Sequence, residues 1–208
     1  MTKRFIKSIA IVAASSVFAV KASLAGDVKL FASGGLLHSN DNYIVKDSDG
    51  KGAAASSNFI KNFGINLSGG AQYAINKYFY VNGEAFAQYR NASASTTSIA
   101  DGNSSLNSRY NLGALARLGV NVNDKSSVYL GAGVSYSPIS MVADGASTKQ
   151  HVISPLLVLG MATDVTESVQ GYVDFQISSS LNSRFRGDDV NVRHDNRSLV
   201  LGVRKFFN

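Results

Sequence analysis

Residues 63–73 read FGINLSGGAQY. The large apolar side chains of this stretch fall on one parity (Phe63, Ile65, Leu67 and Tyr73), and every residue of the other parity is polar or glycine. Successive side chains of a β-strand point to opposite faces of the sheet, so this two-residue period predicts a strand with one apolar face and one polar face. We interpret the stretch as a wall between an apolar and a polar environment.

The same alternation recurs along the chain. Two further stretches fit it less well: residues 27–37 alternate only loosely, and residues 152–163 are apolar on both faces and contain Pro155. Counting these two, eight strands are predicted, at residues 27–37, 63–73, 79–90, 109–121, 128–136, 152–163, 169–177 and 199–207. After residue 25 no stretch has a sustained 3.6-residue apolar stripe or a run of about 18 apolar residues, so transmembrane helices are not expected.

The predicted connections alternate in length. Short connections lie at residues 74–77, 122–127 and 164–168, and long polar connections at residues 38–58, 91–108, 137–150 and 182–196. In an up-and-down antiparallel meander, all short connections fall at one end and all long ones at the other. This is the layout of outer-membrane β-barrels, with tight periplasmic turns and long external loops. An even number of strands also closes the sheet without an exposed edge.

The composition is compatible with one all-β domain and excludes several classes of protein. The chain has 208 residues, of which 45% are hydrophobic, and no cysteine or tryptophan. A mean hydropathy of +0.02 is too low for a protein with several membrane-spanning helices. The absence of cysteine excludes a disulfide scaffold, a cysteine-based zinc site and a thiol nucleophile.

Residues 1–25 are interpreted as a secretory signal peptide. A basic start is followed by an apolar stretch at residues 8–20, which is too short to cross a bilayer comfortably. Small residues permit cleavage after either Ala22 or Ala25, and the sequence leaves both sites open. We therefore predict an exported protein in which residues 26–208 form the β-barrel domain.

Most of the positive charge belongs to this leader. The whole chain has 20 lysines and arginines against 14 aspartates and glutamates, a formal net charge of +6. Removing residues 1–25 takes away four basic residues and no acidic one, which leaves +2. Nucleic acid is therefore not expected among the partners, because binding to phosphates needs a concentrated basic surface.

Aromatic residues stand at both ends of the apolar face. They predict two girdles: Tyr73, Phe79 and Phe207 beside the short turns, and Tyr89, Tyr110 and Tyr136 beside the long connections. Aromatic rings favour the membrane–water interfaces. Ten residues separate Phe79 from Tyr89, which in a tilted strand projects to roughly 25 Å, the height of a barrel's apolar band. The apolar face is therefore predicted to meet lipid.

The polar face carries four charges in mid-strand: Glu84, Arg117, Asp174 and Arg204. Each lies a few residues from the short-turn end, so we expect them to share one layer of the lumen, where opposite charges can pair and offset desolvation. An eight-stranded barrel is just wide enough for side chains to fill, and we predict that this cluster blocks the lumen. A soluble lipocalin- or avidin-like barrel is disfavoured, because these charges would then occupy its core.

The end of the chain carries a family resemblance. Residues 199–207 read LVLGVRKFF. With the signal peptide and the alternating strands, this ending resembles the OmpA/OmpX-like small outer-membrane barrels, in particular the opacity-type surface antigens of Gram-negative bacteria. The resemblance spans residues 27–208. Asn208 after Phe207, and Lys205 in place of an aromatic residue, depart from the family's usual ending.

The resemblance implies a surface protein of the bacterial outer membrane with extracellular loops. It implies that Phe207 is recognised by the barrel-assembly machinery, and that the loops serve adhesion or immune contact. It implies no shared reaction and no cofactor. The expected partners are outer-membrane lipid, lipopolysaccharide and, as a further candidate, host-surface ligands.

An enzyme is the main alternative. His38 and Ser39 invite comparison with lipid A-modifying outer-membrane hydrolases, which use a histidine and a serine near the lipid interface. Adjacent residues of an extended strand point to opposite faces, which argues against a direct proton relay between them. We therefore interpret both as polar loop residues and predict that the protein is not an enzyme.

Metal and anion sites have weaker support. Residues 47–52 read DSDGKG, part of a calcium-loop pattern without its closing glutamate, and His151 and His194 lack metal-ligand spacing. No metal site is predicted. The last long connection contains a basic group interrupted by aspartates. We interpret it as a solvated loop of mixed charge; the alternative is a binding site for lipopolysaccharide phosphates or for a polyanionic host ligand. The members of the basic group are Arg184, Arg186, Arg193 and Arg197.

Overall fold

The computed structural model describes residues 28–46, 52–56, 62–99, 102–143, 146–180, 183–184 and 191–207. The predicted signal peptide lies outside these residues. Within them, the strands are β1 (Val28–Lys46), β2 (Gly52–Ser56), β3 (Phe63–Ala74), β4 (Phe79–Ile99), β5 (Gly102–Asn121), β6 (Ser126–Ala143), β7 (Ala146–Thr166), β8 (Val169–Ser179), β9 (Ser183–Arg184) and β10 (Asn191–Phe207).

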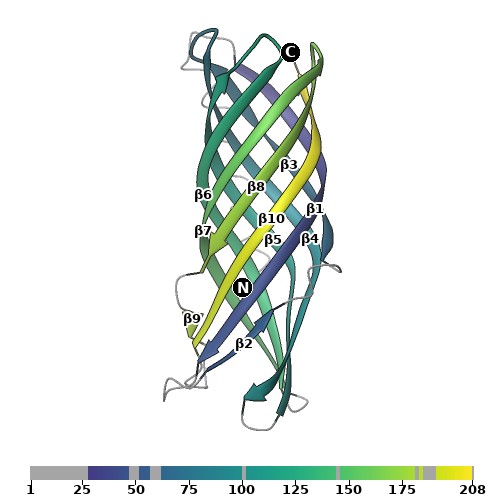
Figure 1. The fold of residues 1–208 in the computed structure, drawn as a ribbon, viewed down its shortest axis with the longest axis vertical. Helices are drawn as coiled ribbons and strands as arrows, with labels where there is room; N and C mark the ends of the chain where they lie inside the picture. The colour runs from purple at the N-terminus through teal and green to yellow at the C-terminus, as the bar shows by residue number, and fades with distance from the viewer. Residues whose placement is uncertain are drawn as a thin grey trace, which may run out of the picture.

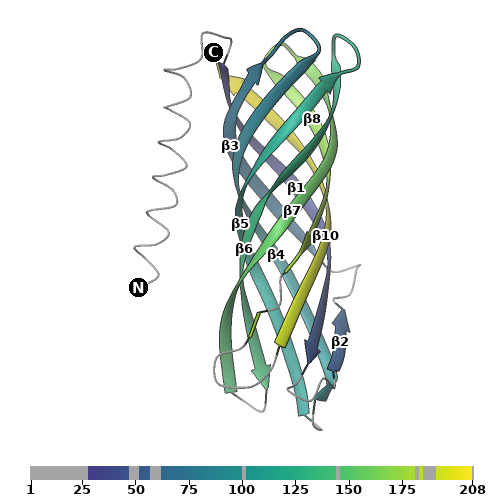
Figure 2. The ribbon, with the colours of Figure 1, turned by 90° about the vertical axis from the view of Figure 1, so that its left-hand side faces the viewer.

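Eight of these strands close into a barrel. Neighbouring strands pair antiparallel in the order β1-β3-β4-β5-β6-β7-β8-β10, and β10 pairs back to β1. The short strands β2 and β9 pair with β1 and β10, respectively, at the loop end, beyond the residues where β3 and β8 pair with the same two strands. The two side views show long, tilted strands around one axis (Figures 1 and 2). The predicted eight-stranded antiparallel barrel is confirmed.

The register of the strands fixes the shape of the barrel. Following directly opposite residues once around the wall leads from Val28 to His38, so β1 is re-entered ten residues further along. The path runs through Tyr73, Val81, Leu118, Leu130, Leu159, Phe175 and Leu199. This stagger requires tilted strands and, with eight of them, an interior that side chains can fill.

Asparagine side chains shape two of the short turns. In the β3–β4 turn, Asn76 Oδ1 accepts hydrogen bonds from the backbone N–H groups of Tyr78 and Phe79, at 2.8 and 2.9 Å. In the β5–β6 turn, Asn123 Oδ1 accepts equivalent bonds from Lys125 and Ser126, at 2.9 and 2.8 Å. A short polar side chain that binds the backbone two or three residues ahead is a strong turn signal, and it keeps these connections tight.

The long polar connections were predicted wrongly as loops. Most of their described residues continue the barrel strands: β1 runs on to Lys46, β4 to Ile99, and β6 to Ala143 before β7 starts at Ala146. Beyond the apolar band the two-residue alternation is lost from the sequence although the backbone ladder continues: residues 91–99 are largely polar on both faces, whereas residues 137–143 (SPISMVA) carry apolar residues on both parities. The barrel is therefore taller at the loop end than predicted.

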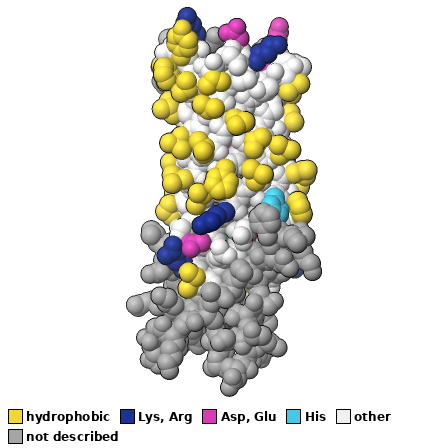
Figure 3. Space-filling model, in the orientation of Figure 1, with side chains coloured by type: hydrophobic (Ala, Val, Ile, Leu, Met, Phe, Trp, Pro, Cys, Tyr) yellow, Lys and Arg dark blue, Asp and Glu magenta, His cyan; other side chains and the backbone are white. Residues whose placement is uncertain are grey.

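The apolar face points outward, as predicted for a membrane barrel. Leu130, Leu159 and Leu201 are 63%, 59% and 59% exposed, whereas Glu84 and Arg117 on the opposite parity are buried. Hydrophobic side chains cover the described wall in a broad band (Figure 3). Charged side chains gather at both edges of this band. Among the described residues, no helix is long and apolar enough to span a membrane.

Candidate functional site

The four charges predicted for the lumen lie together, one on each of β4, β5, β8 and β10. Arg117 pairs with Glu84 through Nη1, and its Nη2 lies 2.6 Å from Asp174 Oδ2. Arg204 Nη2 lies 3.5 Å from Glu84 Oε2. These side chains are at most 3% exposed. Two cations and two anions thus form one buried group, named here the lower cluster; it lies toward the short turns, which are at the top of Figures 1 and 2.

Aromatic rings surround the lower cluster. The guanidinium of Arg204 lies 4.4 Å from the ring centre of Phe31 and 5.3 Å from that of Tyr172. Arg117 lies 5.2 Å from the Tyr129 ring, and the Tyr129 hydroxyl donates a 2.5 Å hydrogen bond to Asp174. A cation over an aromatic face is attracted by the ring's quadrupole, more strongly where water is excluded. The rings therefore hold both guanidinium groups in place and fill the space around them.

An apolar layer follows on the loop side of the lower cluster. Phe86 and Leu115 come two residues after Glu84 and two before Arg117 on their strands, and both are buried. The same buried group includes Leu37, Leu156, Val158 and Val200 from three further strands. Large apolar side chains therefore pack across the lumen at this level. In a water-filled pore the lumen would have to be open here.

An amide network lies beside and above the apolar layer. Gln88 Nε2 donates to Asn66 Oδ1 at 3.2 Å and to Gln176 Oε1 at 3.0 Å. Asn111 Nδ2 donates to Gln88 Oε1 at 3.0 Å, and the Ser137 hydroxyl donates to Asn111 at 3.2 Å. The network joins strands on different sides of the lumen. Because buried amides are costly unless paired, these bonds also fix the positions of the side chains.

A second ionic group, named here the upper cluster, lies nearer the loop end. Asp41 Oδ1 lies 3.1 Å from Arg90 Nη1 and 2.7 Å from His194 Nε2, and it accepts a 2.9 Å bond from Asn196. Asp41 Oδ2 accepts a 3.1 Å bond from the Ser39 hydroxyl. A carboxylate has no proton to give, so Nε2 of His194 is the donor. Asp41 thereby ties β1, β4 and β10 together across the lumen.

The upper cluster was not predicted from the sequence. Arg90 ends a predicted strand, but Asp41 and His194 fall in stretches that were predicted as loops. A signal was present: Asp41 has the parity of Leu37, and His194 has the parity of Val200, and both of those residues are buried in the lumen. Extending each strand by its parity would have placed Asp41 and His194 inside the barrel.

The predicted girdle residues lie at the ends predicted for them along the strands. Near the loop end, Tyr89 and Tyr110 are directly opposite each other, with ring centres 5.3 Å apart. Tyr136, half-buried, is hydrogen-bonded to His151 at 2.5 Å. At the short-turn end Phe79 and Phe207 are exposed, whereas Tyr73 is half-buried.

His38 and Ser39 face opposite sides of β1. The His38 ring lies 4.8 Å from the ring of Phe63 on the outer surface, and Ser39 is buried in the lumen beside Asp41. A proton relay between the two side chains is therefore excluded by geometry.

The predicted basic group is only partly within the described residues. Arg193 is half exposed and lies 3.0 Å from Asp195, and Arg197 is exposed. Of the described side chains near this edge, Arg109 and Lys149 are also exposed cations. Arg186, and residues 47–51 of the calcium-like stretch, lie outside the described part of the chain. Where the structure describes the chain, no group of three acidic or histidine residues could hold a metal ion.

The sequence and the fold match known proteins. Residues 10–204 match the family model described as outer membrane protein beta-barrel domain. Among curated proteins, none matches the chain in sequence.

Three solved structures are among those similar to this chain. The outer-membrane protein OprG from Pseudomonas aeruginosa is 15% identical, covers 88% of this chain and 97% of its own, and has a TM-score of 0.56. Ail, the attachment invasion locus protein of Yersinia pestis, is 18% identical, with 88% and 100% covered and a TM-score of 0.45. Neisserial surface protein A is 19% identical, with 87% and 99% covered and a TM-score of 0.47.

Proposed function

We propose that this chain, which belongs to the outer-membrane protein β-barrel domain family, is a closed, non-enzymatic surface barrel. Its long hairpins make its external contacts. The family places the protein in the bacterial outer membrane. Its role there is to present the hairpins at the cell surface, as an adhesin or surface antigen. A rigid wall that carries long hairpins is well suited to this role, because binding residues commonly lie on segments held by a stable scaffold.

The filled lumen is the observation that carries this proposal. The lower cluster, the apolar layer, the amide network and the upper cluster follow one another from the short turns to the loop end. Water and ions would have to displace all four to pass. An eight-stranded barrel has little room to rearrange them, because its side chains already occupy the interior.

The closure predicts an absence of channels. Purified protein in planar bilayers should give no stable openings of the size that water-filled porins give. A variant that removes two of the four charged side chains of the lower cluster, with Glu84→Ala and Arg117→Ala together, should stay closed because Phe86 and the other apolar residues still block the lumen. Large and stable openings by the unaltered protein would contradict the proposal.

The outer edge of the apolar band suits anionic lipid. Arg109, Lys149 and Arg197 are exposed cations, and the half-buried Asp195 is paired with Arg193. Guanidinium groups bind phosphates with two parallel hydrogen bonds. We therefore propose that these residues contact lipopolysaccharide phosphates, and that polyanionic host ligands are further partners of the hairpins.

The hydrolase alternative is less well supported than the surface role. Ser39 is buried beside Asp41, while His38 lies on the outer surface against Phe63. Asp41, Ser39 and His194 are connected, but the carboxylate stands between the hydroxyl and the imidazole. A general base has to touch the nucleophile that it activates. This arrangement therefore supports a structural role for the three residues.

The end of the chain has a proposed part in assembly. Phe207 is 52% exposed on the outer wall and lies opposite Leu30 of β1, at the seam that closes the barrel. We propose that the barrel-assembly machinery recognises this residue before β1 and β10 pair.

The orientation can be tested by epitope insertion. A tag inserted at residues 144–145, between β6 and β7, should be labelled by antibody on intact cells. The same tag inserted at Asp124 in the β5–β6 turn should be labelled only after the outer membrane is permeabilised. Reversed accessibility of the two tags would contradict the proposed placement of the hairpins outside the cell.

A further inference from the structure

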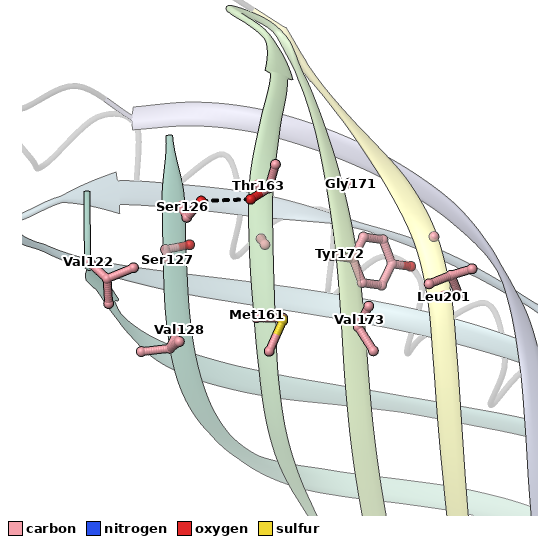
Figure 4. A pocket seen from close by; sticks show the side chains of 12 residues that line it. Val122, Ser126, Ser127, Val128, Met161, Thr163, Gly171, Tyr172, Val173 and Leu201 are labelled. Carbon is pink, nitrogen blue, oxygen red and sulfur yellow. Dashed lines mark hydrogen bonds between the residues drawn. The ribbon is translucent and has the colours of Figure 1, made fainter. Parts of the chain in front are cut away.

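The outer wall has a groove at the short-turn end of the apolar band. Its volume is about 480 Å³, within the usual range for ligand-binding clefts. Its side chains come from the β5–β6 turn and from β6, β7, β8 and β10 (Figure 4). We name it the short-turn groove, and its apolar side chains are Val122, Val128, Met161, Val173 and Leu201.

The groove arises because two neighbouring levels of the wall carry side chains of different size. Val128, Met161, Val173 and Leu201 are directly opposite one another across four strands and form a raised edge. Two residues nearer the short turns, the corresponding positions on β6, β7 and β8 are Ser126, Thr163 and Gly171, which are smaller. The hydroxyls of Ser126 and Thr163 are 2.7 Å apart and hydrogen-bonded to each other (Figure 4), so neither needs an outside partner.

Gly171 leaves the floor of the groove open. A Cβ atom added there would meet nothing closer than 3.9 Å, an ordinary contact distance, so the backbone does not require glycine for space. Met161 and Leu201, at 60% and 59% exposure, stand beside this open floor. The missing side chain creates a hollow in a surface that is otherwise covered by leucine, valine and methionine.

The position of the groove on the barrel limits which molecules can bind in it. It lies on the lipid-facing wall of an outer-membrane protein, so the molecules that meet it are lipids. In that environment burial of apolar surface adds little, because lipid tails are as apolar as leucine, and binding depends on packing and on polar contacts of the headgroup. A flexible chain of methylenes fits a shallow groove with apolar walls.

Charges of both signs border the groove at its polar end. Lys125 directly precedes Ser126 and is exposed. Val203 is directly opposite Gly171 in the ladder, and Lys205 follows two residues later and is exposed. The Nζ atom of Lys205 lies 2.5 Å from Ser168 Oγ. Asp124 and Glu167, both exposed, lie in the adjacent turns. A headgroup with one phosphate and one ammonium group complements such a mixed edge.

We propose that the short-turn groove binds one acyl chain of a phospholipid with a zwitterionic headgroup, whose phosphate meets Lys125 and Lys205. The chain lies across Gly171, between Met161 and Leu201. The bound lipid completes the outer surface of the wall over β6, β7, β8 and β10. This inference goes beyond the surface role and does not depend on which ligands the hairpins bind.

Native mass spectrometry of the purified protein in neutral detergent tests the proposal. Phosphatidylethanolamine, phosphatidylglycerol and an uncharged diacylglycerol are added in separate samples. We expect one phosphatidylethanolamine to be retained per chain, and Gly171→Leu to reduce this retention by about fivefold or more, because the new side chain takes the packing contacts of the lipid chain. Gly83→Leu is the matched control: Gly83 is an exposed glycine of β4 whose added Cβ would meet nothing within 4 Å.

The headgroup has its own pair of variants. Lys205→Gln should lower retention of phosphatidylethanolamine while leaving retention of the diacylglycerol unchanged, because diacylglycerol has acyl chains but no phosphate. Lys77→Gln, an exposed lysine in the β3–β4 turn, should change neither. A heat-dependent shift in gel migration shows for each variant that the barrel is folded.

Three results would overturn the proposal. Equal retention of phosphatidylethanolamine by Gly171→Leu and Gly83→Leu would remove the groove as the binding site. Equal retention of phosphatidylglycerol and phosphatidylethanolamine would remove the zwitterionic headgroup. A dimer that disappears only in Gly171→Leu would assign the groove to a second copy of the chain.

Discussion

Replacing Arg117 by alanine will lower the free energy of unfolding by about 3–5 kcal/mol, the usual loss when one partner of a buried ion pair is removed. The substitution leaves Glu84 and Asp174 as two buried carboxylates that no longer share a cation. It also removes the guanidinium that packs over the Tyr129 ring. Urea unfolding of the protein in lipid vesicles measures the change, followed by circular dichroism because the chain has no tryptophan.

The control for this prediction lies on the same strand. Arg109 is an exposed arginine of β5, and Arg109→Ala should alter the free energy of unfolding by no more than about 0.5 kcal/mol, as is usual for surface positions. Adding Asp174→Asn to Arg117→Ala should restore part of the loss, because it neutralises the carboxylate that loses Arg117, whereas Glu84 keeps Arg204 as a partner. Equal losses for Arg117→Ala and Arg109→Ala would show that the lower cluster contributes nothing to stability.

Replacing Asp41 by alanine will also cost about 3–5 kcal/mol, because it removes the one carboxylate that Arg90 and His194 share. Arg90 is 1% exposed and would remain buried without its partner. The Ser39 hydroxyl and the Asn196 amide would each lose an acceptor as well. The same urea titration measures the loss, and a double-mutant cycle with Arg90→Ala measures the coupling between the two residues.

Asp195 provides the comparison for Asp41. It lies on β10, one residue from His194, and its partner Arg193 is half exposed to solvent. Asp195→Ala should therefore cost at most about 1 kcal/mol, the range of surface ion pairs. Similar losses for Asp41→Ala and Asp195→Ala, or no coupling between Asp41 and Arg90, would contradict the role given to the upper cluster.

The barrel strands could be predicted from the sequence because lipid and lumen impose opposite requirements on neighbouring residues. Within the apolar band, every second side chain is apolar, as residues 63–73 illustrate. The predicted start of β4 at Phe79 and the end of β10 at Phe207 agree with the structure. The opposite ends were predicted too short, because beyond the band neighbouring residues no longer divide into a lipid-facing and a lumen-facing set and the two-residue period disappears.

The charge-bearing positions of the lower cluster could also be predicted, since a charge on the polar parity of a membrane strand must face the lumen. Their exact partners could not. Arg117 is directly opposite Asn82 in the ladder, yet it pairs with Glu84, two residues along β4. Asp174 belongs to β8, which is not adjacent to β5 in the sheet.

The sequence by itself determined the number of barrel strands, which face meets lipid, and that the four mid-strand charges of the lower cluster enter the lumen, because these follow from a local two-residue period. Only the tertiary structure decided which residues meet inside. Closing eight strands with a stagger of ten residues brings Asp41, Arg90 and His194 to one level. That stagger is a property of the whole closed ladder, so no single strand encodes it.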